Sequence, residues 1–503
     1  MYKKTQIKST SKSHKKYILD DNSINKFKTI LINEEKKPQT IKKYMRDIIK
    51  LKEYAAGRPV NKELLITYKE HLKKDCGYKT TSINSFLAVI NTFVTEMGWN
   101  NLKIKMIKVQ KETFVPENKE ISINEYKALI NAAIKKGDER KAGYEHFMMK
   151  EIHEQPKAVK DTLNSVLKDG KLDLSAVELT NDEIKKISQI YIVACGSAYH
   201  AGVVAQYVIE DLAKIPVRVE LASEFRYRKP LLDPDGLVVV ISQSGETADS
   251  LAALRLAKDK GLKTLGIVNV VGSSIAREAD NVFYTLAGPE IAVATTKAYS
   301  TQLIAAYCLA LQFAYVRGEM ELSEYERLLS ELETIPEKIE KILEDKERLQ
   351  WFAAKVANSK DIFFIGRGID YAVSLEGSLK LKEISYIHSE AYAAGELKHG
   401  TISLIEDNIL VIGVLTQSEL YEKTVSNMVE CKSRGAYLCG LTTYGKYEVE
   451  DTVDFTTYIP KIDEHFSASL AVVPLQLLGY YVSVAKGLDV DKPRNLAKSV
   501  TVE

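Results

Sequence analysis

An internal repeat constrains the fold of this 503-residue chain more than any other feature. Residues 409–443 restate residues 236–269 as a run of apolar residues, a polar loop and an amphipathic segment. Strands that alternate with helices in each copy predict parallel, doubly wound α/β sheets, with ligands at the carboxyl ends of the strands. Two copies about 170 residues apart make a tandem pair of domains rather than a solenoid, which needs more units.

The polar loop of the first copy is the strongest chemical signal. Val238–Ile241 is uniformly apolar, as in a strand covered on both faces, and it leads into Ser242, Gln243, Ser244 and Thr247 before a helix. Hydroxyls and backbone N–H groups at the start of a helix suit a phosphate without any cationic side chain. In the overlay of the repeat, residues 416–418 fall on residues 242–244, and residues 362–371 echo residues 191–199. An ordinary helix cap remains the alternative for this segment taken alone.

Charge divides the chain into a basic front and an acidic remainder. Residues 1–140 carry 30 Lys and Arg against 16 Asp and Glu, whereas the remainder carries 40 against 52. We therefore expect two kinds of partner. The five cysteines (Cys76, Cys195, Cys308, Cys431 and Cys439) lack metal-type spacing, which predicts free thiols in the cytoplasm and neither metal nor cofactor. We expect no membrane span, because no apolar run is long enough.

The front of the chain predicts an all-α domain over 20–115 after a basic, disordered tail over 1–19. Apolar residues recur at helical spacing in TIKKYMRDIIKLKEYA (40–55), with Thr40 as a possible cap, and Pro59 is expected to open a further helix. This segment and TSINSFLAVINTFVTEMGW (81–99) resemble the core-binding domain of tyrosine recombinases. The resemblance implies contact with duplex DNA, mostly through phosphates. A solvated bundle whose lysines only keep it soluble is the alternative.

The recombinase resemblance ends early. After a linker, residues 121–142 resemble the first helices of a recombinase catalytic domain, so we assign 116–142 to a linker and a truncated start of that domain. The arginines and the tyrosine nucleophile of that family do not follow, and strand exchange needs both. We therefore expect no recombination.

A second family is recognisable from about residue 143 onward. The motifs are GYEHFMMKEIHEQP, ACGSAYHAG, SQSGETADSL, LAGPEIAVATTKAYSTQL, GRGIDYAVSLEGSLKLKEISYIHSEAYAAGELKHGT and DVDKPRNLAKSVTVE. Together they resemble the isomerase half of glutamine–fructose-6-phosphate aminotransferase (glucosamine-6-phosphate synthase), with two sugar-isomerase (SIS) domains. The resemblance implies a helical lead-in (143–180), a first SIS domain (181–325), a connecting helix (326–350), a second SIS domain (351–493) and a catalytic tail (494–503).

The glutaminase half of that family is not recognisable in the sequence. In the family it begins with a nucleophilic cysteine directly after the initiator methionine, whereas Tyr2 follows Met1 here. We therefore expect no glutamine hydrolysis. Fructose 6-phosphate would then be aminated with ammonia, or only isomerised.

The resemblance implies a role for each candidate site residue. Glu376, Lys380 and Glu383 are spaced to share one helix face, which alone is more often a solvated ion-pair stripe. In the family, Glu383 would move a proton between C1 and C2 while Lys380 steadies the charge on the intermediate. His399 would open the sugar ring from the neighbouring subunit of an obligate homodimer, and Lys498 would form a Schiff base with C2. The substrate-binding residues implied are Ser197, Ser242, Gln243, Ser244, Thr247, Val293 and Ala497.

Two functions remain open at this point. The first is a sugar-phosphate isomerase or aminotransferase behind a foreign helical domain. The second is a non-catalytic fusion in which SIS domains sense a sugar phosphate and the basic domain holds DNA. The presence of all four implied catalytic side chains favours the enzyme, because a sensor has no need of them.

Overall fold

The computed structural model describes residues 17–34, 36–107 and 141–501 of the chain. The chain divides into two compact units, residues 1–128 and 129–503. Most of the basic tail expected over 1–19, and nearly all of the segment expected over 116–142, lie outside the described residues. Each unit is treated by itself below.

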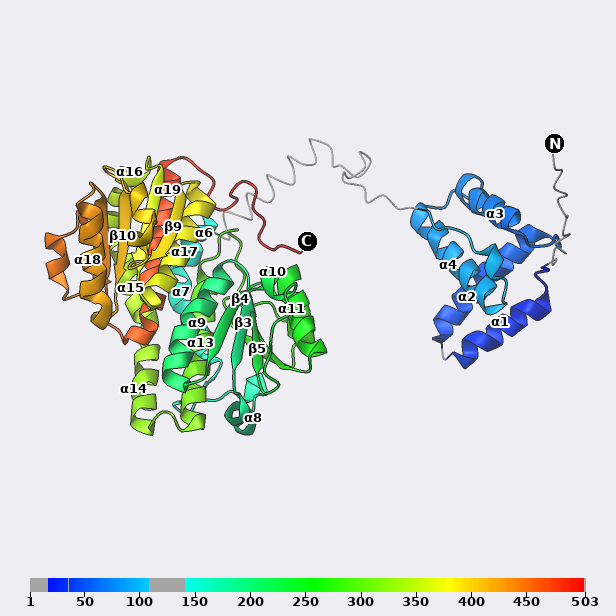
Figure 1. Cartoon of the computed structure of the whole chain (residues 1–503), viewed down its shortest axis with the longest axis horizontal. Helices are drawn as coiled ribbons and strands as arrows, with labels where there is room; N and C mark the ends of the chain where they lie inside the picture. Colours follow the sequence, from blue (N-terminus) through cyan, green and yellow to red (C-terminus); the bar gives the residue numbers. More distant parts are fainter. Residues whose placement is uncertain (1–16, 35, 108–140, 502–503) are drawn as a thin grey trace, which may run out of the picture. The chain divides into compact units, whose positions relative to one another are not determined.

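The first unit is helical, as predicted, and is drawn in blue in Figure 1. Its elements are α1 (Asp21–Asn33), α2 (Pro38–Ala55), α3 (Lys62–Lys74), α4 (Thr80–Glu96) and the 3₁₀ turn η1 (Asn100–Leu102). Phe27 and Phe93 meet edge to face at 5.0 Å in its core, where Leu31, Ile48 and Leu65 are fully buried. Apolar residues at helical spacing thus produce one small hydrophobic core.

Two predicted helix starts in this unit were wrong. Thr40 does not cap α2, because the helix begins two residues earlier at Pro38, whose fixed φ suits the first helical turn. Pro59 does not open α3 either, since the helix begins at Lys62. The side chain of Asn61 accepts a hydrogen bond from the Leu64 N–H and caps it.

The second unit contains two five-stranded sheets in which every strand pair is parallel. This confirms the predicted fold class. The first sheet has the order β4-β3-β5-β6-β7 and the second the order β12-β11-β10-β8-β9, so the same topology occurs twice. The strands are β3 (Ile190–Ala194), β4 (Val217–Leu221), β5 (Leu237–Ser242), β6 (Lys263–Val268), β7 (Asn281–Tyr284), β8 (Asp361–Gly366), β9 (His388–Ala393), β10 (Leu410–Leu415), β11 (Tyr437–Thr443) and β12 (Phe455–Ile459).

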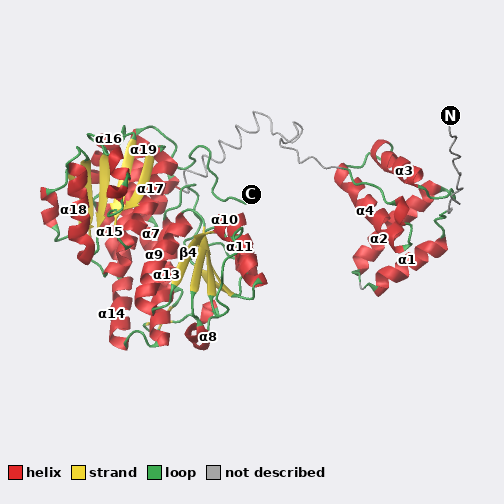
Figure 2. Cartoon of the chain, viewed as in Figure 1, coloured by secondary structure: helices red, strands yellow, loops and turns green. Residues whose placement is uncertain are grey.

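Alternating side chains of each sheet face two separate layers of helices, seen in red around the yellow strands in Figure 2. In the first sheet, Ile192 and Val239 face α9 (Ser197–Ala213) and α13 (Lys297–Arg317). The opposite face packs on α10 (Ala222–Phe225), α11 (Ala248–Asp259) and α12 (Ser274–Glu278). Burial on both faces explains the uniformly apolar strands.

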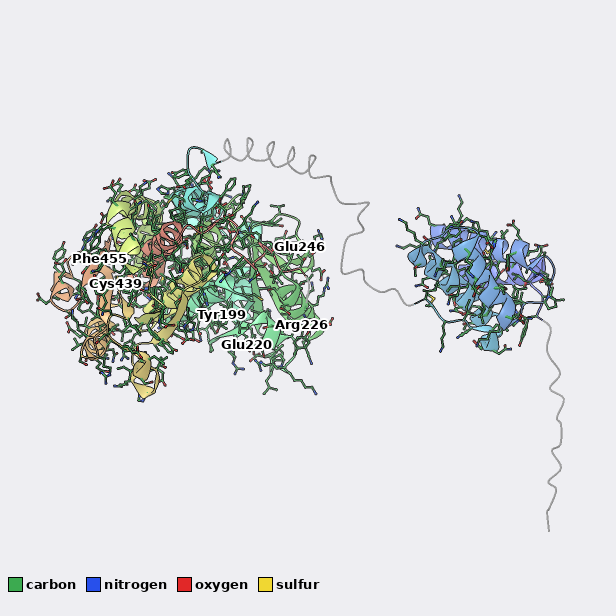
Figure 3. All side chains as sticks on the ribbon, turned by 90° about the horizontal axis from the view of Figure 1, so that it is seen from above. Tyr199, Glu220, Arg226, Glu246, Cys439 and Phe455 are labelled. Carbon is green, nitrogen blue, oxygen red and sulfur yellow. The ribbon has the colours of Figure 1, made fainter. Side chains whose placement is uncertain are left out.

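The second sheet is built in the same way. One of its faces packs on α17 (Ile369–Ser385) and α19 (Ser467–Ala485), and the other on α18 (Tyr421–Lys432). Cys439 on β11 and Phe455 on β12 are register partners, and their side chains lie together in Figure 3. Helix α19 is long and apolar enough to cross a membrane, but 89% of its apolar window is buried inside the protein. It is therefore a central core helix.

The helices between the two sheets join the domains into one core, because α9 packs against α17. A lead-in of α6 (Phe147–His153), α7 (Gln155–Asn164), the β1–β2 hairpin (Leu167–Lys168 and Lys171–Leu172), η3 (Ser175–Val177) and α8 (Asn181–Lys186) precedes the first sheet. Three helices connect the domains, α14 (Leu322–Glu333), α15 (Ile335–Glu344) and α16 (Lys346–Val356), where we expected a connecting helix over 326–350. Short 3₁₀ turns η4 (Leu397–His399), η5 (Thr401–Leu404), η6 (Ser418–Leu420), η7 (Tyr447–Asp451) and η8 (Glu464–Phe466) complete the second domain.

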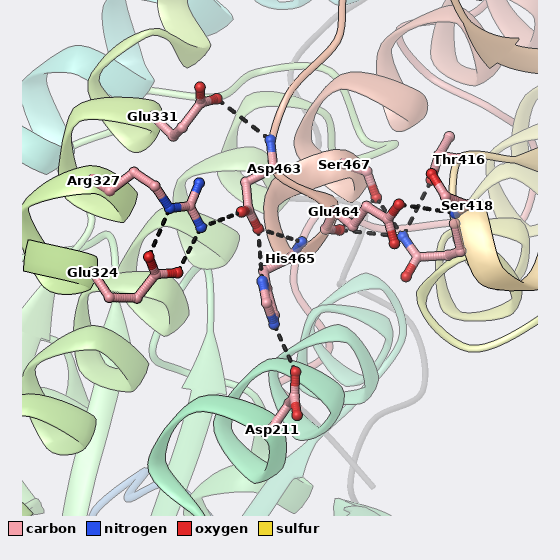
Figure 4. A network of polar contacts seen from close by, with 11 residues as sticks. Asp211, Glu324, Arg327, Glu331, Thr416, Ser418, Asp463, Glu464, His465 and Ser467 are labelled. Carbon is pink, nitrogen blue, oxygen red and sulfur yellow. Dashed lines mark hydrogen bonds and ion pairs between the residues drawn. The ribbon is translucent and has the colours of Figure 1, made fainter. Parts of the chain in front are cut away.

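A polar clasp ties the second domain to the first (Figure 4). His465 lies between Asp463, at 2.6 Å, and Asp211 of α9, at 2.8 Å, while Arg327 of α14 contacts Asp463 at 2.8 Å. Burial opposes a charge on His465, but the hydrogen bonds to the two aspartates outweigh it and raise the pKa of the imidazole. The clasp ties the turn that precedes α19 to α9 and α14.

Candidate active site

A cavity of about 150 Å³ lies at the carboxyl ends of β3 and β5, in the first α/β domain. Parallel doubly wound sheets place ligand sites at this edge. All the predicted substrate-binding residues line the cavity, together with Glu383 and Lys498: these are Ser197, Ser242, Gln243, Ser244, Thr247, Val293 and Ala497. Segments about 300 residues apart in the sequence therefore meet at one place.

The loop after β5 presents its hydroxyls to this cavity. The Ser242 hydroxyl accepts a hydrogen bond from the Gly245 N–H at 3.1 Å and lies 3.1 Å from the Thr247 hydroxyl. Gly245 has φ of 64°, and a Cβ there would lie 2.0 Å from the Ser273 hydroxyl, so the turn requires glycine. The result is a cradle of hydroxyl and backbone N–H groups at the start of α11, suited to an anion.

The carboxyl-terminal tail lies across this loop. The Ser499 hydroxyl donates to the Ser244 hydroxyl at 3.1 Å, and the Ala248 N–H donates to the Val500 carbonyl at 3.1 Å. Farther back, the Arg494 N–H donates to the Tyr386 hydroxyl at 2.8 Å. These three anchors bring Lys498 to the edge of the cavity.

The amine of Lys498 is held by the loop that carries Val293. Its Nζ lies 2.5 Å from Oε2 of Glu290 and donates to the Ala292 carbonyl at 2.8 Å. The Glu290 side chain is fully buried. Burial alone would raise its pKa, but Lys498 and the N–H groups of Thr296 and Ala298 outweigh burial and lower it. The lysine therefore rests as an ammonium paired with a carboxylate.

The lead-in helix α6 is hydrogen-bonded to this loop. Glu151 on α6 is almost completely buried, and its Oε1 accepts hydrogen bonds from the Ile291 N–H at 2.5 Å and the Ala292 N–H at 3.3 Å. Burial and the neighbouring Glu290 raise the pKa of Glu151 to about 8. Asp491, just before the tail, accepts from the first N–H groups of α6, at Phe147 and Met148, and its own carbonyl accepts from the Val293 N–H.

Sequence reasoning missed Glu290 and Glu151. Glu290 lies in the motif LAGPEIAVATTKAYSTQL, three residues before Val293, but nothing in the pattern separates it from an ordinary loop glutamate. Glu151 lies about 140 residues upstream in a short helix with other charged residues. Only its burial in the folded chain distinguishes it.

Helix α17 delivers the predicted carboxylate and lysine. Lys380 is fully buried, contacts Glu383 and lies 3.4 Å from Glu376, whose Oε2 accepts a hydrogen bond from Nδ1 of His200 at 2.8 Å. Burial opposes the charge of Lys380, but Glu376 and Glu383 raise its pKa. Glu383 lines the cavity, whereas Lys380 reaches it through Glu383. The predicted shared helix face is confirmed by these contacts, and a buried cluster replaces the solvated stripe.

The fold does not place the predicted catalytic residue His399 at this cavity. It ends the 3₁₀ turn η4 (Leu397–His399), is exposed, and is not among the lining residues. Within this chain, the cavity therefore combines an amine, a carboxylate and a hydroxyl cradle, but lacks an imidazole among the residues that line it.

Comparison with known proteins agrees with this arrangement. The SIS domain family matches residues 183–312 and 355–486, one match over each sheet. The chain is 56% identical over 406 residues to a glutamine–fructose-6-phosphate aminotransferase (isomerizing) of Clostridium tetani, covering 80% of this chain and 66% of that protein. It is 57% identical over 364 residues to the protein of the same name from Caldanaerobacter subterraneus, covering 72% of this chain and 60% of that protein.

One of the similar solved structures contains only the C-terminal domain of such a protein. The C-terminal domain of glucosamine-fructose-6-phosphate aminotransferase from Francisella tularensis superposes with a TM-score of 0.68 at 39% identity, over 70% of this chain and 99% of that chain. The present chain thus spans about three fifths to two thirds of the curated relatives that it matches. It belongs to the SIS-domain family, and within that family it carries the isomerase half of the glutamine–fructose-6-phosphate aminotransferases.

Proposed function

We propose that the chain converts fructose 6-phosphate to glucosamine 6-phosphate with ammonia as the amine donor, and isomerises the sugar phosphate when ammonia is absent. The observation that carries the proposal is the meeting of Lys498, Glu383 and the Ser242–Thr247 cradle at one cavity. The cradle would hold the phosphate, and the tail that covers it would exclude water. Such closure places the reacting carbons between an amine and a carboxylate.

The chemistry proceeds in three steps under this proposal. Lys498 passes its proton to Glu290 and attacks C2 of the open-chain ketose, and water leaves as the imine forms. Ammonia then displaces the lysine amine from C2. The Glu383 carboxylate takes a proton from C1 and returns it to C2, while the buried ammonium of Lys380 stabilises the charge that develops between them.

We propose that His399 acts at the cavity of a second copy of the chain, which makes the enzyme a homodimer. Its exposure and its absence from the lining residues of its own chain's cavity support this assignment. An imidazole can serve as both base and acid in opening the sugar ring. The described cysteines are all free thiols, which supports a cytoplasmic location.

The test uses the 503-residue chain with fructose 6-phosphate, with and without ammonium chloride, and with glutamine in parallel. We expect glucosamine 6-phosphate only with ammonium, glucose 6-phosphate without it, and neither product from Lys498→Ala. Absence of both products from the folded protein would refute the proposal. Glutamate release from glutamine above a control without enzyme would refute ammonia as the donor.

We further propose that the helical unit binds duplex DNA through phosphate contacts. The cations Lys28, Lys42, Arg46 and Lys50 support this, because they lie together around a groove of about 720 Å³ on α1 and α2, whose other lining residues are apolar except for Glu53. The affinity of the full chain for a duplex should fall steeply with salt, and replacing Lys42 and Arg46 by glutamate should weaken binding at low salt. A duplex left unshifted by the full chain at low ionic strength would remove this proposal.

A further inference from the structure

The anion loop of the first SIS domain has a structural counterpart in the second. Residues 242–244 lie at the end of β5 and residues 416–418 follow β10, and these are the middle strands of their sheets. The turns that precede α9 and α17 also match, since Gly196 has φ, ψ of 56°, −132° and Gly368 has 58°, −128°. The two domains therefore have the same backbone arrangement at the place where the first domain has its candidate ligand site.

One position differs within this arrangement. Ala198 stands two residues after Gly196 and lines the active-site cavity, whereas Asp370 stands two residues after Gly368. The Asp370 side chain is almost fully buried, at 2% exposure. Its Oδ2 accepts from the Thr416 N–H at 2.8 Å and the Gln417 N–H at 3.2 Å, and its Oδ1 accepts from the Thr416 hydroxyl.

A second carboxylate takes the next donor of the same loop. The Ser418 N–H donates to Oε1 of Glu464 at 2.9 Å, and Figure 4 shows Glu464 beside Thr416 and Ser418. Three consecutive N–H groups of the loop are thus bonded to carboxylates of the chain itself. Within the described part of the chain, no carboxylate accepts from the N–H groups of Gln243 or Ser244, so the first loop keeps these two donors for a ligand.

We infer that Asp370, together with Glu464, fills a phosphate site of the second SIS domain and so restricts phosphate binding to the first domain. A carboxylate accepts the same N–H hydrogen bonds as a phosphate oxygen, and a phosphate dianion is repelled from a loop that already holds two negative charges. Removing the Asp370 carboxylate should expose a site for inorganic phosphate or a phosphate monoester. This inference goes beyond the proposed function and does not depend on it.

The experiment exchanges the two residues in the full chain and counts bound phosphate. Asp370→Ala gives the second domain the residue of the first, and Ala198→Asp does the reverse. Equilibrium dialysis with labelled inorganic phosphate measures sites per chain, and circular dichroism verifies the fold of each variant. We expect Asp370→Ala to bind one more phosphate than the wild type, and Ala198→Asp to lose the wild-type site, with an affinity at least about 10-fold weaker. The double variant should bind one phosphate, now in the second domain.

The outcomes decide the inference without reference to catalysis. A folded Asp370→Ala protein with no additional site would overturn it, and so would an Ala198→Asp protein that binds phosphate as the wild type does. If Asp370→Ala fails to fold, the Ala198→Asp variant decides alone, because it alters the other domain. A wild type without any site would count against the proposed function only, while a site gained by Asp370→Ala would still support the inference.

Discussion

The Nζ of Lys498 lies 2.5 Å from Oε2 of Glu290, although the two residues are 208 positions apart. The ion pair fixes a tail lysine, which is ordinarily mobile, against the loop that carries Ala292 and Val293. It also supplies an acceptor for the proton that Lys498 must lose before it can act as a nucleophile. Lysine and carboxylate thus form an ion pair at the wall of the cavity.

Glu151 should hold this loop through its hydrogen bonds and not through its charge. Because burial raises its pKa to about 8, the side chain is mostly protonated at pH 7. Glu151→Gln keeps the oxygen that accepts from the Ile291 and Ala292 N–H groups, so we expect imine formation near the wild-type rate. Glu151→Ala removes the acceptor, and the rate of borohydride trapping should fall about 10-fold or more. Equal rates in the two variants would contradict this role.

Glu383→Gln should separate imine formation from proton transfer. The amide cannot accept a proton from C1, whereas Lys498 is unchanged. We expect trapping of fructose 6-phosphate at the wild-type level, but loss of solvent deuterium exchange at C1 by at least about 100-fold. Exchange at the wild-type rate in the variant would show that another group moves the proton.

Complementation tests the assignment of His399 to a neighbouring subunit. His399→Ala and Lys498→Ala should each be inactive with the cyclic sugar. Mixed dimers of the two variants contain one site with both residues intact if His399 acts across the interface, and should recover about half the activity of the wild type. Mixed dimers that stay inactive would place His399 in its own chain's site, or outside the chemistry.

Much of this arrangement could be predicted from the sequence, and the part that could not has a physical reason. The apolar run Val238–Ile241 predicts a buried parallel strand because no alternation leaves a polar face, and the spacing of Lys380 and Glu383 places them on one helix face. Glu151 and Asp370 carry no comparable pattern. Each acts through a contact with a loop about 50 to 140 residues away, and such contacts arise only from tertiary packing.

Helix ends were also beyond the sequence pattern in two places. Thr40 and Asn61 are both common capping residues, so residue type alone does not show which of them caps its helix. In the structure Pro38 starts α2 ahead of Thr40, whereas Asn61 caps α3. The periodicity of apolar residues locates a helix, but its ends depend on which neighbouring cap forms.

Asp370 should make the second domain less stable as pH rises through the mildly acidic range. Burial raises its pKa from 3.8 to about 6, so the folded state binds a proton more tightly than the unfolded state. The corresponding stabilisation is fully present below about pH 4 and is lost as the pH rises through 6. The pKa shift corresponds to about 3 kcal/mol in the free energy of unfolding. Urea unfolding between pH 4.5 and 7 should show this decline in the wild type but not in Asp370→Asn, and equal slopes would contradict it.

The proposed function depends on a covalent imine between Lys498 and fructose 6-phosphate. Borohydride reduces that imine to a stable secondary amine, and peptide mass spectrometry then locates the modified residue. We predict one reduced sugar phosphate per chain, on Lys498, and none on Lys498→Ala at the same protein concentration. Trapping at the wild-type level in Lys498→Ala, or modification of another lysine in the native chain, would show that Lys498 is not the residue that forms the imine.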